Sequence, residues 1–166
     1  MKSIYYLLIF VMFAAQILIG CKSDTNNPIT GSQQEVNRIV FNGGGFNNAS
    51  AQAYMTYAGY YPSMDKTGFS FYIIISPDTM YLLLYTPGQT TGTFPWMTEG
   101  DHAILYVTGH NSGHYNAEGS GTTTITSYGN VGQNIQGNFN GKVDAAIPPY
   151  DTINVSCSNF SVNRHQ

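Results

Sequence analysis

The sequence predicts an all-β domain, an antiparallel β-sandwich of about nine strands, with a small β-barrel as the alternative. Short runs of alternating apolar and polar residues are separated by Gly, Pro, Asn and Asp, and no run keeps an apolar period of 3.6 residues. Only 9% of the 166 residues are charged, whereas Gly and Tyr are abundant, which suits turns and strands better than helix surfaces. Two packed sheets can each bury one face, so a sandwich is the simplest architecture.

The first twenty residues are typical of a cleaved signal peptide. Lys2 supplies a positive charge, an uncharged apolar run follows, and Gly20 stands at its end. The run is shorter than the ~20 apolar residues that cross a bilayer as a helix, so we expect cleavage rather than retention. The sequence Leu18-Ile19-Gly20-Cys21 resembles the bacterial lipobox. That resemblance implies a diacylglyceryl group on the thiol of Cys21 and an acylated new amino terminus, which together anchor a protein to a membrane. An ordinary secretory signal with a chance cysteine is the alternative.

Residues 21–34 follow as a polar segment with Pro and Gly and without apolar periodicity, so we expect a flexible tether behind the lipidated cysteine. Lys22 stands where an aspartate would resemble an inner-membrane retention signal, which favours the outer membrane. Its periplasmic and surface faces both stay open. The predicted organisation is a signal peptide over 1–20, a lipidated tether over 21–34 and a single β-sandwich domain over 35–166.

Within that domain the alternating runs indicate strands in chain order. The expected strands cover 36–41, 51–61, 69–76, 80–86, 103–108, 113–118, 122–128, 133–145 and 152–162. The pair 69–76 and 80–86 flanks a Pro-Asp turn and is apolar on both faces, so we expect a central hairpin covered on each side. Cys157 alternates with Ile153 and Val155 and is expected on the inward face, where no disulfide partner remains once Cys21 is lipidated.

A motif near the carboxyl end supports the sandwich. It consists of a G-x-F-x-G-x-V strand beginning at Gly137 and a final F-x-V-x-R strand beginning at Phe160. The pair is similar to the carboxyl end of many uncharacterised β-sandwich lipoproteins of Bacteroidetes and related bacteria, and it covers roughly a quarter of the chain. The resemblance implies a fold and carries no activity.

Charge and motifs narrow the function classes. Six basic residues stand against nine acidic ones, a net charge of −3, so no basic stripe exists for nucleic acid. The sequence contains no G-x-S-x-G, C-x-x-C or H-E-x-x-H pattern, and we expect neither an enzyme nor a cofactor.

Two groups of residues are candidates for a site. Trp96, the only tryptophan, lies in a Gly- and Pro-rich connection where its ring is either a stacking platform for sugars or a plug for the end of the sandwich. Tyr60 and Tyr61 are read in the same way, as a binding stripe or as cross-strand packing. A metal site would need convergence of the residues His102, His110, His114 and Glu118. Loop histidines hydrogen-bonded to their neighbours are the simpler reading.

These observations leave two hypotheses from different classes. The first is a lipid-anchored binding or adhesion module, with a glycan as the ligand. The second is a structural or assembly component of the envelope that binds another protein. A metal-dependent hydrolase comes third and depends on the histidines converging.

Overall fold

The computed structural model describes residues 35–96, 103–146 and 151–166, without the side chains of 117–119. The unit Gln34–Gln166 is compact, and its described residues form strands and turns without a helix. The strands are β1 (Arg38–Gly43), β2 (Phe46–Gln52), β3 (Met55–Tyr61), β4 (Lys66–Ile75), β5 (Asp78–Pro87), β6 (Gly92–Trp96), β7 (Ala103–Thr108), β8 (Gly113–Ser127), β9 (Asn134–Ala145) and β10 (Thr152–Asn163).

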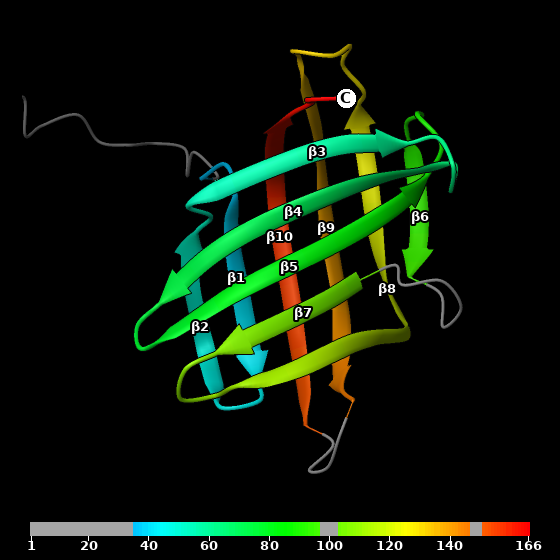
Figure 1. Cartoon of the computed structure of the whole chain (residues 1–166). Coiled ribbons are helices and arrows are strands. Elements are labelled where there is room, and N and C mark those ends of the chain that lie inside the picture. Colours follow the sequence, from blue (N-terminus) through cyan, green and yellow to red (C-terminus); the bar gives the residue numbers. More distant parts are fainter. Residues whose placement is uncertain (1–34, 97–102, 147–150) are drawn as a thin grey trace, which may run out of the picture. The chain divides into compact units, whose positions relative to one another are not determined.

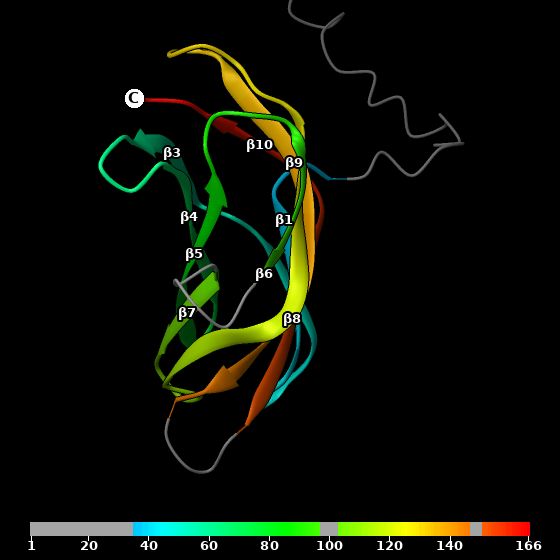
Figure 2. The same cartoon turned by 90° about the vertical axis from the view of Figure 1, so that its right-hand side faces the viewer.

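All ten strands belong to one antiparallel sheet with the order β2-β1-β10-β9-β8-β7-β5-β4-β3, and β6 pairs with β8. The sheet folds over itself (Figure 1). We call β3, β4, β5, β7 and the start of β8 the front layer, and β2, β1, β10, β9, the rest of β8 and β6 the back layer. Seen from the side, the two layers lie face to face (Figure 2). The predicted all-β, sandwich-like fold is therefore confirmed.

The fifteen-residue strand β8 belongs to both layers because it bends. It pairs with β9 both before and after the bend, while on its other side the first residues pair with β7 and the last residues pair with β6. The register with β9 shifts between Ala117 and Gly121, which marks the irregularity at the bend. Two predicted strands, 113–118 and 122–128, are thus one strand.

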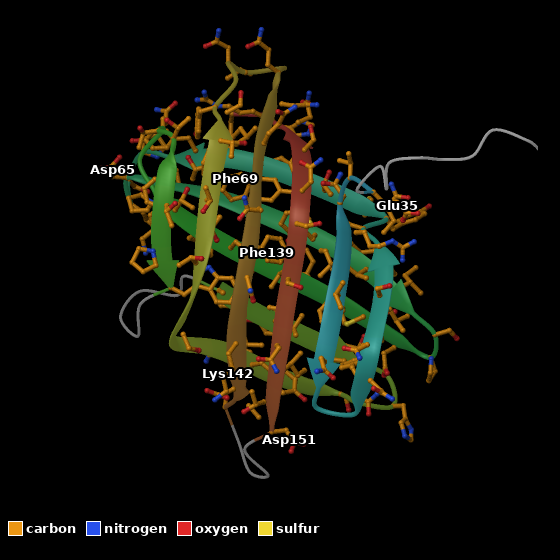
Figure 3. The ribbon with its side chains drawn as sticks, turned by 180° about the vertical axis from the view of Figure 1, so that it is seen from behind. Glu35, Asp65, Phe69, Phe139, Lys142 and Asp151 are labelled. Carbon is orange, nitrogen blue, oxygen red and sulfur yellow. The ribbon has the colours of Figure 1, made fainter. Side chains whose placement is uncertain are left out.

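The core lies between the layers and is built from the inward face of every long strand. Phe69 and Phe71 of the front layer meet Phe139 and Phe160 of the back layer, with ring centroids 5.5 to 6.1 Å apart. Figure 3 shows Phe69 and Phe139 from behind. All four rings are at most 2% exposed. Burial of one such ring stabilises the fold by about 1.5–3 kcal/mol, so this cluster is the main connection between the layers.

One expectation about the central hairpin is wrong. The strands β4 and β5 do lie in the middle of the front layer, but their outward face has no second layer over it in the described part of the chain. Ile74 is 50% exposed and Tyr81 is 40% exposed. The outward apolar residues of this hairpin therefore form a surface.

The last residues of the chain run beside the outer edge of β3. Ala58 bridges Arg164 in a parallel arrangement, the amide of His165 donates to the carbonyl of Ala58 at 2.9 Å, and the amide of Tyr60 donates to the carbonyl of Gln166 at 2.9 Å. Arg164 lies over the ring of Tyr128, 5.1 Å from its centroid. This segment, which we call the terminal strap (164–166), covers part of an edge that would otherwise be open.

Candidate functional site

A row of aromatic side chains crosses the outward face of the front layer. Register makes Tyr72 of β4, Tyr81 of β5 and Tyr106 of β7 direct neighbours, with Met55 of β3 before them and His114 of β8 after them. Side chains alternate between the two faces of a strand, so these residues point outward while their chain neighbours fill the core. Met55 is 61% exposed, and Tyr81 and Tyr106 are 40% and 41% exposed. Large aromatic side chains are unusual on a solvent face.

A second row runs parallel to the first, two residues further along the strands. It comprises Tyr57, Ser70, Leu83, Ile104 and Asn116, each paired with the next across neighbouring strands. Ser70 is small, and so is Gly68, the next outward residue on β4. Because β4 carries small side chains between the large ones of β3 and β5, the surface is hollow there.

The hollow has a volume of about 480 Å³, within the range of small-ligand pockets. Ser70 and Leu83 form its floor. We call it the tyrosine groove, after the five tyrosines that line it: Tyr57, Tyr61, Tyr72, Tyr81 and Tyr85. No Asp, Glu, Lys, Arg or His side chain is part of this lining.

Gly68 shapes one wall of the tyrosine groove. A Cβ atom at this position would lie 2.8 Å from the ring of Tyr61 and 3.0 Å from that of Tyr85. The two rings lean over β4 with centroids 6.5 Å apart and planes at 59°. Burial, and then the nearby Tyr57 and Tyr81, raise the pKa of Tyr61 above its ordinary value, so its hydroxyl is protonated at neutral pH.

The end of the tyrosine groove at β3 is held by the terminal strap. The ring of His165 stacks on that of Tyr57, with centroids 4.8 Å apart and planes at 7°. A Cβ at Gly59 would lie 2.8 Å from the side chain of Gln166 and 3.0 Å from the hydroxyl of Tyr57, so the strap packs directly on this glycine. The position of the Tyr57 ring therefore depends on residues far away in the sequence.

Of the two readings of Trp96, the structure shows the plug at the end of the core and not the exposed stacking platform. Its side chain is 1% exposed, and its Nε1 donates to the hydroxyl of Thr123 at 2.9 Å. A Cβ at Gly121 or Gly141 would lie within 2.3 Å and 2.1 Å of the indole. The ring therefore covers the backbone of two paired glycines, one of them in the G-x-F-x-G-x-V motif, and closes the core as a plug.

The two predicted tyrosines separate. Tyr61 lines the tyrosine groove, whereas Tyr60 points to the other face of β3 and donates from its hydroxyl to Asp65 Oδ1 at 2.8 Å. This hydrogen bond to a carboxylate raises the pKa of Tyr60. Tyr60 has a structural partner and no place in the groove.

The histidines lie at the turn between β7 and β8. His110 and His114 line a pocket of about 360 Å³ with Tyr115 and Asp151. His114 stacks on Tyr106 at 4.5 Å, and its Nε2 is buried without a hydrogen-bond partner among the described residues. No three His, Cys, Asp or Glu side chains within the described part of the chain are placed to hold a metal ion. His102 and the side chain of Glu118 lie outside that part, so the four-residue metal site stays a prediction.

The turn that carries His110 is fixed by a buried carboxylate. Asp78 is 2% exposed and accepts hydrogen bonds from the backbone amide and the side-chain amide of Asn111, each at 2.8 Å. Burial opposes the charged form, but the hydrogen bonds from Asn111, together with the backbone and the charge of His110, outweigh it and lower the pKa of Asp78. Asp78 therefore acts as a structural anion.

The two cysteines differ. Cys157 is 1% exposed on the inward face of β10, as predicted, and burial raises the pKa of its thiol to about 11. Such a thiol is protonated at neutral pH and reacts poorly. Cys21 lies outside the described residues, as do the rest of the predicted signal peptide and most of the tether.

No protein-family model, curated protein or solved structure matches this chain. Among the described residues, no helix is long and apolar enough to span a membrane.

Sequence reasoning missed most of the groove. The alternating runs around Tyr72, Tyr81 and Tyr85 predict strands, but nothing within these runs marks the three tyrosines as part of a site. The available signal was the alternation of Tyr81, Leu83 and Tyr85 on one face, opposite the apolar residues that fill the core. Register across strands, which brings these positions beside Tyr72 and Tyr106, is not visible in a single run.

Proposed function

We propose that the protein is a lipoprotein anchored to the bacterial outer membrane through Cys21, whose β-sandwich domain is a non-catalytic module that binds a glycan. The lipobox-like residues 18–21 and the polar segment after them support the anchor. The tyrosine groove supports the binding role and is the single observation on which the choice of ligand rests.

The groove suits a sugar because it offers flat rings and neutral hydroxyls together. Sugars present apolar C–H faces that pack on aromatic rings, and their hydroxyls need hydrogen-bond partners at the rim. The five tyrosines supply both, and the hydroxyl of Ser70 stands on the floor. The lining holds no carboxylate or imidazole that would serve as a general acid or base. A binding role therefore fits the groove better than hydrolysis.

A glycan array probed with the full chain, purified in detergent, tests the binding role. We expect binding to neutral glycans, and Tyr81→Ala should weaken it at least tenfold because one exposed ring is removed. Gln136→Ala, an exposed change on β9 of the opposite face that lines no pocket in the described part of the chain, is the matched control and should bind like the wild type. An array without signal, or signal that Tyr81→Ala leaves unchanged, would refute the proposal.

A second variant tests the shape of the groove rather than its rings. Gly68→Ala places a methyl group within 3.0 Å of two tyrosine rings and changes the shape of that wall of the hollow. We expect weaker glycan binding with little loss of stability, because the ends of both side chains can move outward. Unchanged binding would mean that the ligand does not enter the hollow.

The anchor is tested independently of the ligand. Cells grown with radioactive palmitate should label the wild-type chain, and Cys21→Ser should abolish the label. A labelled Cys21→Ser chain would contradict lipidation at this residue and leave the glycan proposal unaffected.

The runner-up function, an envelope component that binds another protein, is favoured by one observation. Strand β2 pairs with β1 alone among the described strands, so its outer edge is open to a partner strand. Ser50 is exposed on β2, and Ser50→Lys would place a charge on that edge. Chemical cross-linking of the wild type and of Ser50→Lys tests this function. If the wild type bound no glycan but was cross-linked to another protein, and Ser50→Lys lost that cross-link, the second function would be favoured over the first.

A further inference from the structure

The tyrosine groove has one closed end. At β3 the terminal strap occupies the backbone edge through hydrogen bonds at Ala58 and Tyr60, and His165 lies flat against Tyr57. Gln166 packs over Gly59. A chain lying in the groove could not continue past β3 without displacing these contacts.

At the other end, no described strand crosses the outward face of the front layer. The floor row continues in register from Leu83 to Ile104 of β7 and Asn116 of β8, and the aromatic row beside it continues from Tyr81 to Tyr106. The four steps from β3 to β8 span about 19 Å at the usual strand spacing. This length suits a short oligosaccharide better than a single sugar.

The polar groups of the floor row are neutral as far as Asn116, whose cross-strand neighbour on β9 is Asp144, a carboxylate 3.3 Å from the ammonium group of Lys142. The side-chain amide of Asn116 makes no hydrogen bond within the described part of the chain, and it lies at the open end beside the aromatic row. No charged side chain lines the hollow, so a charged sugar would lose hydration there without gaining a counter-charge.

We propose that the groove binds the end of an uncharged glycan chain, with the terminal sugar over Ser70 and the following sugars leaving across β5 and β7 toward Asn116. This inference rests on the proposed glycan-binding function and adds to it the charge, the length and the chain-end specificity of the ligand. The terminal strap is the element that excludes internal segments of a polymer.

Partial hydrolysis of neutral polymers tests chain-end recognition. Cellulose, laminarin, starch and mannan are immobilised before and after mild acid treatment, and the ends are counted by a reducing-sugar assay. On the polymers that bind the protein, saturation binding per mass should rise in proportion to the number of ends. Binding that stays constant would overturn chain-end recognition while the proposed function stands. Binding to none of the four would overturn both.

Two further measurements separate length from end recognition. The affinity for linear oligomers of the bound polymer should rise from one sugar unit up to about four, the number that fills ~19 Å. Asn116→Ala should lower the affinity for the longer oligomers and leave that for the shorter ones unchanged. Affinity that is equal for one unit and for longer oligomers would overturn the path toward β8.

His165→Ala tests the role of the strap, because the backbone hydrogen bonds of residue 165 do not depend on its side chain. In this variant the ratio of binding to unhydrolysed polymer over binding to hydrolysed polymer should rise several-fold, because internal segments gain access past Tyr57. Asn138→Ala on the back layer is the control and should keep the wild-type ratio. An unchanged ratio in His165→Ala would refute closure by the strap.

Discussion

The two layers are both built from antiparallel strands, but their outward faces carry different side chains. The front layer presents the row Tyr72, Tyr81 and Tyr106 beside a hollow, whereas the outward face of the back layer presents small polar residues such as Asn140 and Thr122. The back layer has a hollow too, of about 610 Å³, but its lining includes Glu35 and Arg38 and no tyrosine. Figure 3 shows this back layer toward the viewer. An ordinary solvated strand face needs polar side chains and no more. The proposed binding role of the front face rests on this difference.

The back layer also has a large aromatic side chain, but it points inward. Trp96 should therefore matter for stability and not for the ligand. Trp96→Ala is expected to lower the free energy of unfolding by about 3–5 kcal/mol, because it leaves a cavity over two glycines and removes the bond to Thr123. Urea denaturation measures the change, and the folded variant should still bind glycan. Lost binding at unchanged stability would reverse the roles assigned to the two layers.

Asp78, the buried carboxylate at the far end of the front layer, allows residues that stabilise this layer to be compared with residues that line its groove. Asp78→Asn should lower the free energy of unfolding by about 1–3 kcal/mol, since a neutral amide satisfies fewer of the donors from Asn111. Because folding lowers the pKa of Asp78, its carboxylate contributes stability above its ordinary pKa of about 4. That contribution is lost as the pH falls through the lower pKa of the folded state.

Denaturation of the wild type and of Asp78→Asn between pH 2 and pH 7 measures this effect, and the two stabilities should approach each other on the acid side. Glycan binding at neutral pH should be unaffected, because Asp78 lies at the turn between β4 and β5 and outside the groove lining. A stability difference that does not depend on pH would show that Asp78 is not held as an anion.

Removal of one exposed ring should affect the ligand and not the fold. Tyr81→Ala is expected to cost about 1.4 kcal/mol of binding free energy, which is a tenfold change in Kd, with a much smaller change in the free energy of unfolding. Isothermal calorimetry and urea denaturation on the same preparation measure both quantities. A large loss of stability with intact binding would place Tyr81 among the core residues.

The smallest effect is expected on the back face. Asn140→Ala should leave both the free energy of unfolding and the glycan affinity within about 0.5 kcal/mol of the wild type. If this change weakened binding as much as Tyr81→Ala, the back face would be a second site and the contrast between the layers would fail.

Most of the fold could be predicted because long strands carry their own signal. The runs that became β4, β5, β9 and β10 alternate over many residues, and their ends fall at Gly, Pro or Asn. Two shorter strands could not be predicted, each for a local reason. Strand β6 contains Pro95 and was read as a connection, and the Asn-rich start of β2 hid a strand before 51–61. Neither has an alternation long enough to outweigh its turn-forming residues.

The site was harder to predict than the fold. The Gly- and Pro-rich connection around Trp96 allows either a platform or a plug, because the sequence does not show which way the side chain points. The tyrosines of the groove come from three strands, and only the pairing of Tyr57 with Ser70 and of Ser70 with Leu83 brings them around one hollow. Such cross-strand proximity arises from tertiary structure, and the small size of Ser70 gains meaning only beside its neighbours.

The pairing of the first strand with the last has a consequence for how the domain folds. Strand β1 lies beside β10, and the side chain of Asn37 exchanges hydrogen bonds with the backbone of Ser161 at 3.1 and 2.9 Å. Contacts of such long sequence separation close a large loop, so folding on the millisecond-to-second scale is expected. Without β10, the pair β1–β2 has no hydrogen-bonded connection to β9 within the described part of the sheet. A chain that lacks β10 would thus expose apolar residues of the core, such as Phe41 and Phe139.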